Sequence, residues 1–335
     1  MNKLPIIITS GEPSGIGAEI IIKAYKKIKN KIPCILMGDE KFLKKIAIKN
    51  NVSLQKIKKP KEYKNFNDKL CVLNFDYDIE PIPGKPNKRN SKKVIENIVN
   101  CTKLVLNNEC SALVTAPIDK GILKEGTLFE YPGHTEFISN LCKNKTSPIM
   151  MMMSKNLKVT TITTHIPLKD VSKEINPSKI FQFIKILNSE IELKFNMIKP
   201  KILVTGLNPH AGERGKIGDE EQKIILPTIE KLKKSNINIY GPVSADTAFL
   251  KKNLDFFDVF VCMYHDQALI PIKILDFFGS INVTLGIPII RTSPDHGTAY
   301  DIAGKNTSNP DSMIFAIEQA YSIYKNQNEK IVKNK

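Results

Sequence analysis

Three of the five histidines in the chain each follow an apolar, β-branched run. His165 closes LKVTTITTH, His210 follows KILVTGLNP, and His265 ends DVFVCMYH. In an open α/β sheet the ligand crevice lies outside the carboxyl ends of the strands, so these imidazoles can converge although they are far apart in the sequence. Three histidines around an open fourth position form a catalytic divalent-metal site, with zinc the first candidate by ligand type.

Two aspartates accompany these histidines. Asp246 lies in GPVSADT, and Asp266 directly follows His265. Either carboxylate could be an extra metal ligand, orient an imidazole by a hydrogen bond, or accept a proton. The alternative interpretation is that the histidines close unrelated strands and have only structural roles.

A second group of residues suits an anion. GHTE (133–136) places His134 and Thr135 at an expected helix start, where free backbone N–H groups favour negative charge. Lys273, Asn282 and Arg291 lie in ALIPIK, INVTLG and PIIRTS. A cation, an amide and a guanidinium near a metal suit a small substrate that bears phosphate or carboxylate. Each residue alone is equally consistent with a solvated lysine, a turn asparagine or a structural ion pair.

Two glycine-containing loops also stand out. SGEPSGIG (10–17) follows the first apolar run, but its spacing is not GxGxxG, and its glycines are also consistent with a tight strand-to-helix turn. DHGTAYDIAG (295–304) has neither helical nor strand periodicity. A loop with so much specific polar detail more often binds a ligand than merely connects two elements.

The elements that must position these residues alternate along the chain. Short β-branched runs lie at 5–10, 33–38, 70–75, 111–117, 157–164, 201–206 and 258–264, and stretches of helical period lie at 17–30, 91–108, 177–195 and 218–235. Asn176 before Pro177 is typical of an N-cap with proline at the first helical position. This alternation predicts an α/β protein with mostly parallel strands covered by helices.

The bulk composition sets wider bounds. A chain of 335 residues and 37.7 kDa is too long for one small core and favours two domains. No apolar run is long enough to cross a bilayer, and the N-terminus lacks a signal-peptide pattern, so we expect a cytoplasmic protein without membrane partners. The six cysteines form no CxxC pair and suit buried thiols.

The formal net charge of +16 comes from lysines spread along the chain rather than from one cluster. Such a balance attracts phosphorylated small molecules non-specifically. No recognition motif for nucleic acid is present and aromatic residues make up only 7% of the chain, so we expect no nucleic-acid partner.

Eight motifs together carry a resemblance to a known family. They are SGEPSGIGAE, VTAPIDKG, YPGHTEF, TTHIPL, GLNPHAGE, GPVSADTAF, YHDQALIPIK and NVTLGIPIIRTSPDHGTAYDIAG, and they run in order from residue 10 to residue 304. In this set the chain resembles the 4-hydroxythreonine-4-phosphate dehydrogenases, the PdxA family of vitamin B6 biosynthesis.

The resemblance implies oxidation of 4-phosphooxy-L-threonine by NAD or NADP, followed by loss of carbon dioxide to give 3-amino-2-oxopropyl phosphate. It also implies a divalent metal (zinc first, with magnesium or cobalt as alternatives) and a homodimer whose active site is shared between subunits. Carried over by motif, the metal ligands are His165, His210 and His265, and the substrate contacts are His134, Thr135, Lys273, Asn282 and Arg291. We expect Asp246 or Asp266 to accept the proton and Lys273 or the metal to stabilise the enolate-like charge.

The fold that the resemblance implies is that of the isocitrate and isopropylmalate dehydrogenases, with two α/β/α domains and an active-site cleft between them. The expected domains are 1–130 plus 285–335, carrying the cofactor loop, and 131–284, carrying the metal ligands and dimer contacts. HGTAYDIAG is similar to the adenosine-binding loop of those enzymes, which assigns His296, Gly297, Thr298 and Asp301 to the cofactor. His296 would then lie at the adenine, and Asp301 would accept from the ribose 2′-hydroxyl and disfavour a 2′-phosphate.

One position departs from the family pattern, because Arg214 stands where a glycine is expected after GE. Three other functions remain open. A sister dehydrogenase would oxidise 4-phospho-threonate or 4-phospho-erythronate, a metal-dependent hydrolase could use the same histidines, and a nucleic-acid-binding module would rest on the net charge.

Overall fold

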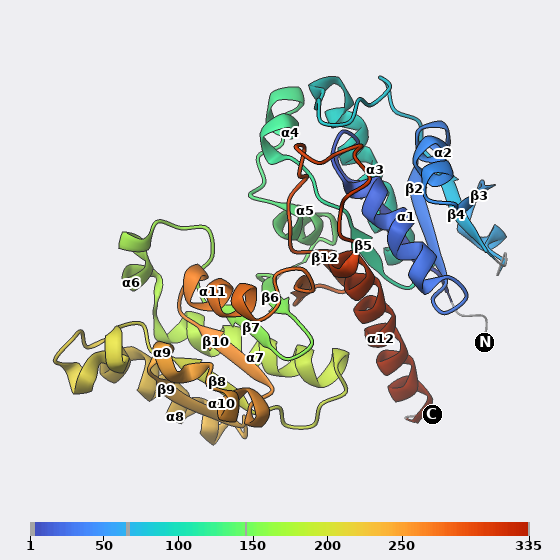
Figure 1. The fold of residues 1–335 in the computed structure, drawn as a ribbon. Coiled ribbons are helices and arrows are strands. Elements are labelled where there is room, and N and C mark those ends of the chain that lie inside the picture. The colour runs from blue at the N-terminus through green and yellow to red at the C-terminus, as the bar shows by residue number, and fades with distance from the viewer. Residues whose placement is uncertain (1–3, 65–67, 145, 334–335) are drawn as a thin grey trace. The chain divides into compact units, whose positions relative to one another are not determined.

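The protein, in a computed structural model, is described here for residues 4–64, 68–144 and 146–333. The chain divides into two compact units (Figure 1). The first unit comprises Met1–Pro148 and Ile287–Lys325, and the second comprises Ile149–Gly286 and Asn326–Lys335. The chain therefore leaves the first unit once and returns to it. The domain boundaries expected from the sequence remain a separate proposal, and the two units are named below as the first and the second.

The first unit contains a parallel sheet in the order β3-β4-β2-β1-β5-β12. Its strands are β1 (Ile6–Thr9), β2 (Cys34–Gly38), β3 (Ser53–Ile57), β4 (Lys69–Asn74), β5 (Leu113–Thr115) and β12 (Arg291–Pro294). Its helices are α1 (Gly17–Ile28), α2 (Glu40–Lys49), α3 (Ser91–Leu106), α4 (Lys120–Gly126), α5 (His134–Leu141) and the start of α12 (Asp311–Lys333). Figure 1 shows β12 and α12 returning, in red, among elements drawn in blue and green.

The core of the first unit follows from strands that are apolar on both faces. Ile7 of β1 and Ile35 of β2 pack with Ile98 of α3 in one buried cluster. Ile6 and Ile8 are buried as well, and side chains of adjacent strand residues point to opposite faces. Such two-sided burial is typical of a parallel sheet with helices on both faces.

The second unit contains a mixed sheet in the order β11-β6-β7-β10-β8-β9. Its strands are β6 (Ile149–Met153), β7 (Lys158–Thr161), β8 (Ile202–Thr205), β9 (Ile239–Val243), β10 (Val259–Cys262) and β11 (Ile281–Leu285). Strands β7, β10, β8 and β9 pair in parallel, whereas β6 is antiparallel to both of its neighbours. The expected α/β fold with mostly parallel strands is therefore confirmed.

The helices of the second unit are α6 (Val171–Glu174), α7 (Pro177–Lys194), α8 (Leu226–Lys234), α9 (Ala245–Ala248), α10 (Lys251–Phe256) and α11 (His265–Leu275). Ala268 and Ile272 of α11 pack against Val159 of β7 and Phe260 of β10 in one buried cluster. These contacts use one face of α11, and the opposite face is exposed. Short helical turns complete the chain at Pro60–Glu62, Lys88–Asn90, Leu168–Asp170, Pro209–Gly215 and Glu221–Ile225.

The helix boundaries follow local chemistry. The side chain of Asn176 accepts a hydrogen bond from Lys179 N at the start of α7, so the expected cap is confirmed. The helix expected at 218–235 runs from Glu221 to Lys234, and its first turn, Glu221–Ile225, is of the π type and continues directly into α8. Pro227 lies in the first turn of α8, where its missing N–H costs least.

Two further expectations can be compared with the structure. Within the part of the chain that the structure describes, no helix is long and apolar enough to span a bilayer. Five cysteines are buried and lie outside any disulfide, namely Cys34, Cys71, Cys101, Cys110 and Cys262, and Cys142 is partly exposed. The thiols expected from the sequence are thus confirmed as small apolar groups rather than as cross-links.

Candidate active site

The three candidate metal ligands follow three adjacent strands of the second unit. β10 lies between β7 and β8, and all three run in parallel, so their carboxyl ends share one edge of the sheet. His165 follows β7, His265 follows β10 and His210 follows β8. The rings of His165 and His265 lie with centroids 5.9 Å apart at an angle of 45°. The sheet thus brings two of the predicted imidazoles side by side.

His265 is the first residue of α11, and its neighbour fixes its orientation. The Nδ1 atom of His265 lies 2.7 Å from Oδ1 of Asp266. With the proton on Nδ1, this nitrogen donates to the carboxylate and leaves the lone pair of Nε2 available. A carboxylate behind an imidazole is the usual arrangement for a metal-binding histidine. Of the roles considered for Asp266, this contact supports orientation of the ring.

His210 lies in a turn wound in the left-handed sense. The five consecutive residues from His210 to Arg214 all have φ between +42° and +76°. The carboxylate of Glu221 holds the chain just before this turn, because it accepts hydrogen bonds of 2.7 Å from both Leu207 N and Asn208 N. Glu221 is buried, and Gly212 leaves the space that its carboxylate occupies. The shape of the His210 loop therefore depends on Glu221, a residue that the sequence pattern places only within the expected helix at 218–235.

Asp246 lies in α9, near His210. Ser244 Oγ donates a 2.6 Å hydrogen bond to Oδ1 of Asp246. This bond holds the pKa of Asp246 below its usual range, and the charge of His210 acts in the same direction. A carboxylate so stabilised is ionised at neutral pH and is a weak base.

The three histidines do not form a finished metal site within one chain. Among the described residues, no group of three or more histidine, cysteine, aspartate or glutamate side chains is arranged to hold a metal ion. Two imidazoles on one zinc ion, with Zn–N bonds of about 2.1 Å, have ring centres about 5 Å apart. The spacing of His165 and His265 fits such a pair, whereas the part of His210 stays a prediction.

A pocket of about 420 Å³ opens beside these residues in the second unit. Asp246 and Asp266 line it together with apolar side chains of α9 and α11, among them Phe249, Ile270 and Ile274. The two candidate proton acceptors thus border one hollow.

The predicted anion-binding group divides between the two units, and its larger part lies in the first. Arg291 at the start of β12 is only 3% exposed, and its Nη2 donates a 2.7 Å hydrogen bond to Thr115 Oγ1. Its Nη1 lies 3.4 Å from Thr135 Oγ1, a weaker contact. Burial lowers the pKa of Arg291 to about 10, so the guanidinium remains charged at neutral pH. A buried cation of this kind favours an anionic partner.

His134 begins α5, as expected from the sequence, and lies near this cation. Burial lowers the pKa of His134 well below its usual range, and the charges of Arg291 and Lys120 lower it further. The ring is therefore neutral, and its buried Nε2 has no hydrogen-bond partner among the described residues. A neutral imidazole with a spare nitrogen next to a cation suits a ligand hydroxyl or phosphate oxygen.

Lys273 and Asn282 lie in the second unit. Lys273 Nζ donates to Ser280 Oγ at 3.3 Å and lies 5.3 Å from the centre of the Phe277 ring. Asn282 belongs to β11, and its buried Oδ1 has no hydrogen-bond partner within the described residues. Lys273 thus lies in the last turn of α11, and Asn282 lies in the next element of the chain, β11.

The candidate cofactor loop in the first unit packs against the turn of residues 10–17. Ile16 N donates a 3.0 Å hydrogen bond to Thr298 O, and a Cβ on Gly15 would lie 2.8 Å from the same oxygen. Tyr300 Oη donates to Oδ2 of Asp119 at 3.0 Å. Gly15 thus permits close packing of the two loops, a role that needs no GxGxxG spacing.

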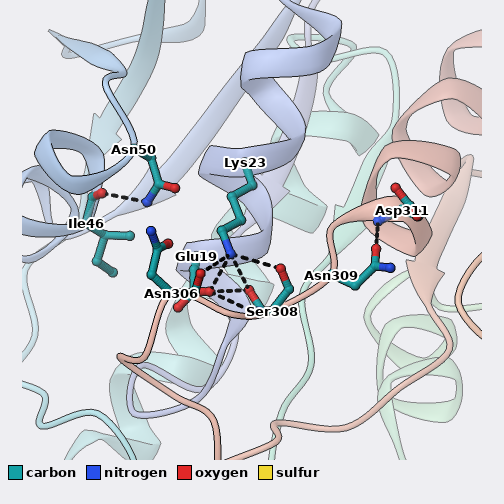
Figure 2. Close-up of polar contacts among 8 residues, drawn as sticks. All are labelled: Glu19, Lys23, Ile46, Asn50, Asn306, Ser308, Asn309 and Asp311. Atoms are coloured by element: carbon teal, nitrogen blue, oxygen red, sulfur yellow. Dashed lines mark hydrogen bonds and ion pairs between the residues drawn. The ribbon is translucent and has the colours of Figure 1, made fainter.

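Within this loop, His296 Nδ1 donates to Gly297 O at 3.0 Å, and Asp301 is exposed. The exit of the loop, Asn306 to Ser308, is bonded to Glu19 and Lys23 of α1 (Figure 2). The residues predicted for the cofactor therefore lie on one loop that is tied to α1.

Sequence reasoning missed several residues of this unit. Thr115 and Lys120 both belong to VTAPIDKG, a motif that was recognised but from which no functional residue was taken. Glu12 is 2% exposed, and its Oε1 accepts from Ser14 N at 3.1 Å. Burial raises the pKa of Glu12 to about 7, and the charge of Asp119 acts in the same direction. Only the folded environment could reveal this shift.

The comparisons with known proteins agree with the motifs. A family model described as "Pyridoxal phosphate biosynthetic protein PdxA" matches residues 29–320. The chain belongs to this family. A protein of Sulfurihydrogenibium sp. named 4-hydroxythreonine-4-phosphate dehydrogenase is 44% identical over 94% of this chain and 97% of its own length. A protein of the same name from Roseobacter denitrificans is 42% identical over 94% of this chain and 96% of its own length.

A crystal structure of 4-hydroxythreonine-4-phosphate dehydrogenase from Klebsiella pneumoniae has the same fold. Its TM-score is 0.86 at 34% identity, and the match covers 96% of this chain and 100% of that one. The family resemblance expected from the eight motifs is therefore confirmed over nearly the whole chain.

Glu12 makes the stability of the protein depend on pH. Between pH 4.5 and 7 the folded state keeps a proton on Glu12 that the unfolded state has lost, so stability falls as the pH rises through this range. Glu12→Gln keeps an acceptor for Ser14 N without the charge. We expect the free energy of unfolding of Glu12→Gln, relative to that of the wild type, to be about 3 kcal/mol higher at pH 8 than at pH 4.5. Urea unfolding at both pH values measures this gain, and Glu125→Gln on exposed α4 is the control. An equal gain at both pH values would contradict the assignment.

Arg214 adopts a backbone conformation that favours glycine, with φ of +59°. Arg214→Gly should therefore stabilise the folded protein by about 1 kcal/mol, because the left-handed region costs a side chain roughly that much. Equilibrium unfolding in urea gives the free energy. Lys216→Gly is the matched control, since Lys216 lies in the same turn with φ of −80° and should lose stability instead. Destabilisation in both variants would show that the turn is not strained at Arg214.

Proposed function

We propose that the protein oxidises 4-phosphooxy-L-threonine with NAD or NADP to 2-amino-3-oxo-4-phosphooxybutanoate. This product then loses carbon dioxide to give 3-amino-2-oxopropyl phosphate, a step of pyridoxal 5′-phosphate biosynthesis in the cytoplasm. The observation that carries the proposal is full-length similarity to relatives that bear the dehydrogenase name. The chemistry of the candidate site residues is consistent with it.

The phosphate of the substrate is assigned to the buried cation of the first unit. Arg291 is charged and held by Thr115, so its guanidinium is fixed before a ligand arrives. His134 is neutral and offers Nε2, and Thr135 offers a hydroxyl at the start of α5. Fixed donors bind an anion without the entropic cost of ordering long side chains.

The metal of the proposed reaction is assigned to His165, His210 and His265, with zinc, magnesium or cobalt as candidates. The chemistry of the donor set fits, because neutral imidazoles are ligands for such cations and Asp266 orients one of them. When bound, a divalent metal polarises the substrate hydroxyl and makes its proton easier to remove. His265 then serves to hold the ion, and Asp266 serves to hold His265.

The proton and charge transfers are assigned to residues of the second unit. Asp246 and Asp266 border the same pocket, and both are candidates for accepting the hydroxyl proton. Each carboxylate already has one oxygen in a hydrogen bond, Asp266 with His265 and Asp246 with Ser244, so both remain candidates. Lys273 supplies a cation for the enolate-like charge that develops as carbon dioxide leaves.

The dinucleotide is assigned to the loop with His296, Gly297, Thr298 and Asp301. The carboxylate of Asp301 is exposed and available to a ribose hydroxyl. The same carboxylate would repel a 2′-phosphate, which favours NAD over NADP.

The outward face of α11 supports the proposed homodimer. Ile270 and Ile274 are exposed there, with Ile274 79% exposed, and Phe277 is exposed just after the helix. Leu275 and Phe278 extend this apolar surface. An apolar surface of this kind marks an interaction site. Because α11 begins at His265, docking of a second copy on α11 would complete the pocket beside Asp246 and Asp266.

The activity can be tested directly with 4-phosphooxy-L-threonine, NAD and a divalent metal. We expect NADH to appear at 340 nm and carbon dioxide to be released, whereas 4-phospho-threonate should react at least tenfold less efficiently. His265→Ala should lose at least 99% of turnover and also lose bound metal measured by mass spectrometry. Lys234→Ala on α8 is the control. A preference for the threonate would favour a sister dehydrogenase, and phosphate release without NADH would favour a hydrolase.

The dimer can be tested by light scattering after gel filtration. The wild type should have twice the chain mass of 37.7 kDa at micromolar concentration. Ile274→Glu should shift it to monomer, because a charge would be buried against an apolar surface. Ile198→Glu is the matched control, since Ile198 is also exposed in the second unit but belongs to the segment between α7 and β8. A fully active monomeric wild type would contradict the proposal.

A further inference from the structure

A dense polar network joins α1 to the exit of the candidate cofactor loop (Figure 2). Glu19 Oε1 accepts hydrogen bonds from Lys23 Nζ at 2.8 Å, from Ser308 N at 3.0 Å and from the Ser308 hydroxyl. Lys23 Nζ also donates to Asn306 O and to Ser308 O, each at 2.9 Å. Two side chains one turn apart on α1 thus bind two carbonyls, one amide and one hydroxyl of residues 306–308. We call Glu19 and Lys23 the clamp.

The clamp is shielded from solvent. The side chain of Glu19 is 6% exposed and that of Lys23 is 18% exposed. Burial alone would raise the pKa of Glu19, but the bonds from Lys23 and Ser308 more than offset it and hold this pKa below its usual value. The carboxylate is therefore charged at neutral pH. Charge-assisted hydrogen bonds in such surroundings are stronger than exposed ion pairs.

The same helix also binds the entrance of the loop. Ile16 N, just before α1, donates to Thr298 O, and Gly15 allows the two backbones to touch. The segment between these anchors contains no strand, and residues 304–307 are all exposed. Beyond the clamp, Asn309 Oδ1 accepts from Asp311 N and starts α12. The loop is therefore held at its entrance by the residue before α1 and at its exit by the first two turns of α1, and between these anchors Tyr300 bonds Asp119.

We infer that Glu19 and Lys23 are positioning residues for the dinucleotide: they hold residues 306–308 so that the loop is ordered before the cofactor binds. This inference rests on the proposed function of the loop. Neither side chain needs to touch the cofactor. A loop that is ordered in advance loses less conformational entropy on binding, so its affinity is higher.

Lys23→Met removes the ammonium while keeping most of the side-chain volume. Loss of charged bonds that order the loop should raise KM for NAD about tenfold. We expect kcat at saturating NAD and KM for the phosphorylated substrate to stay within about twofold, because the substrate residues are separate. Lys23→Arg should recover most of the affinity. Lys26→Met is the matched control, since Lys26 lies on the exposed face of the same helix.

Hydrogen exchange provides a second readout that does not depend on the identity of the reaction. Amides of residues 298–308 should exchange at least tenfold faster in Lys23→Met than in the wild type or in Lys26→Met. If the wild type fails to reduce NAD, the proposed function is wrong while this measurement still tests the clamp. Unchanged exchange, or an unchanged KM for NAD in an active enzyme, would overturn the inference.

A third variant covers the case in which Lys23→Met does not fold. Ser308→Ala removes the hydroxyl that bonds Glu19 but leaves the ion pair and the backbone bonds. It should show the same two effects at about threefold, because one hydrogen bond of several is lost. A folded Ser308→Ala with wild-type exchange and wild-type KM for NAD would contradict the clamp.

Discussion

The parallel pairing of β7, β10 and β8 is the constraint on which the chemistry of the second unit depends. Parallel strands that are neighbours must end on the same edge, so residues that follow them are delivered to one place whatever their distance in sequence. His165 and His265 follow adjacent strands and their rings lie side by side. Strand β6 pairs with the other side of β7 and is antiparallel to it, so β6 does not separate the three parallel strands β7, β10 and β8.

In the first unit the candidate site is organised around a buried charged residue, Arg291. Arg291 keeps its charge although it is almost fully buried, and the nearby His134 is kept neutral. Only Arg291 is therefore charged, and His134 is not. A single buried charge has a smaller desolvation cost than two when no ligand is bound. The same arrangement leaves a candidate anion site, in which Arg291 contacts the hydroxyls of Thr115 from β5 and Thr135 from α5.

Sequence patterns predicted the elements that rest on local chemistry. Alternating apolar runs indicated β1, β2 and β10, and Asn176 with Pro177 indicated the start of α7. The left-handed turn at His210 could not be read in this way, because Glu221 shapes it from outside the segment. The raised pKa of Glu12 likewise depends on burial beneath chain that lies far away in sequence. Residue type and spacing thus identified candidate ligands, whereas the groups that support them required tertiary structure.

Because of the carboxylate of Glu221, the His210 loop needs no anion from solution to hold its shape. It lies between Gly206 and Gly212, at positions where any larger side chain would collide with its oxygens. Backbone amides that point inward at a bend commonly recruit phosphate or sulfate from the medium. Here the chain supplies that counter-anion covalently, so the bend can keep its form through changes of buffer that would strip a dissociable ion.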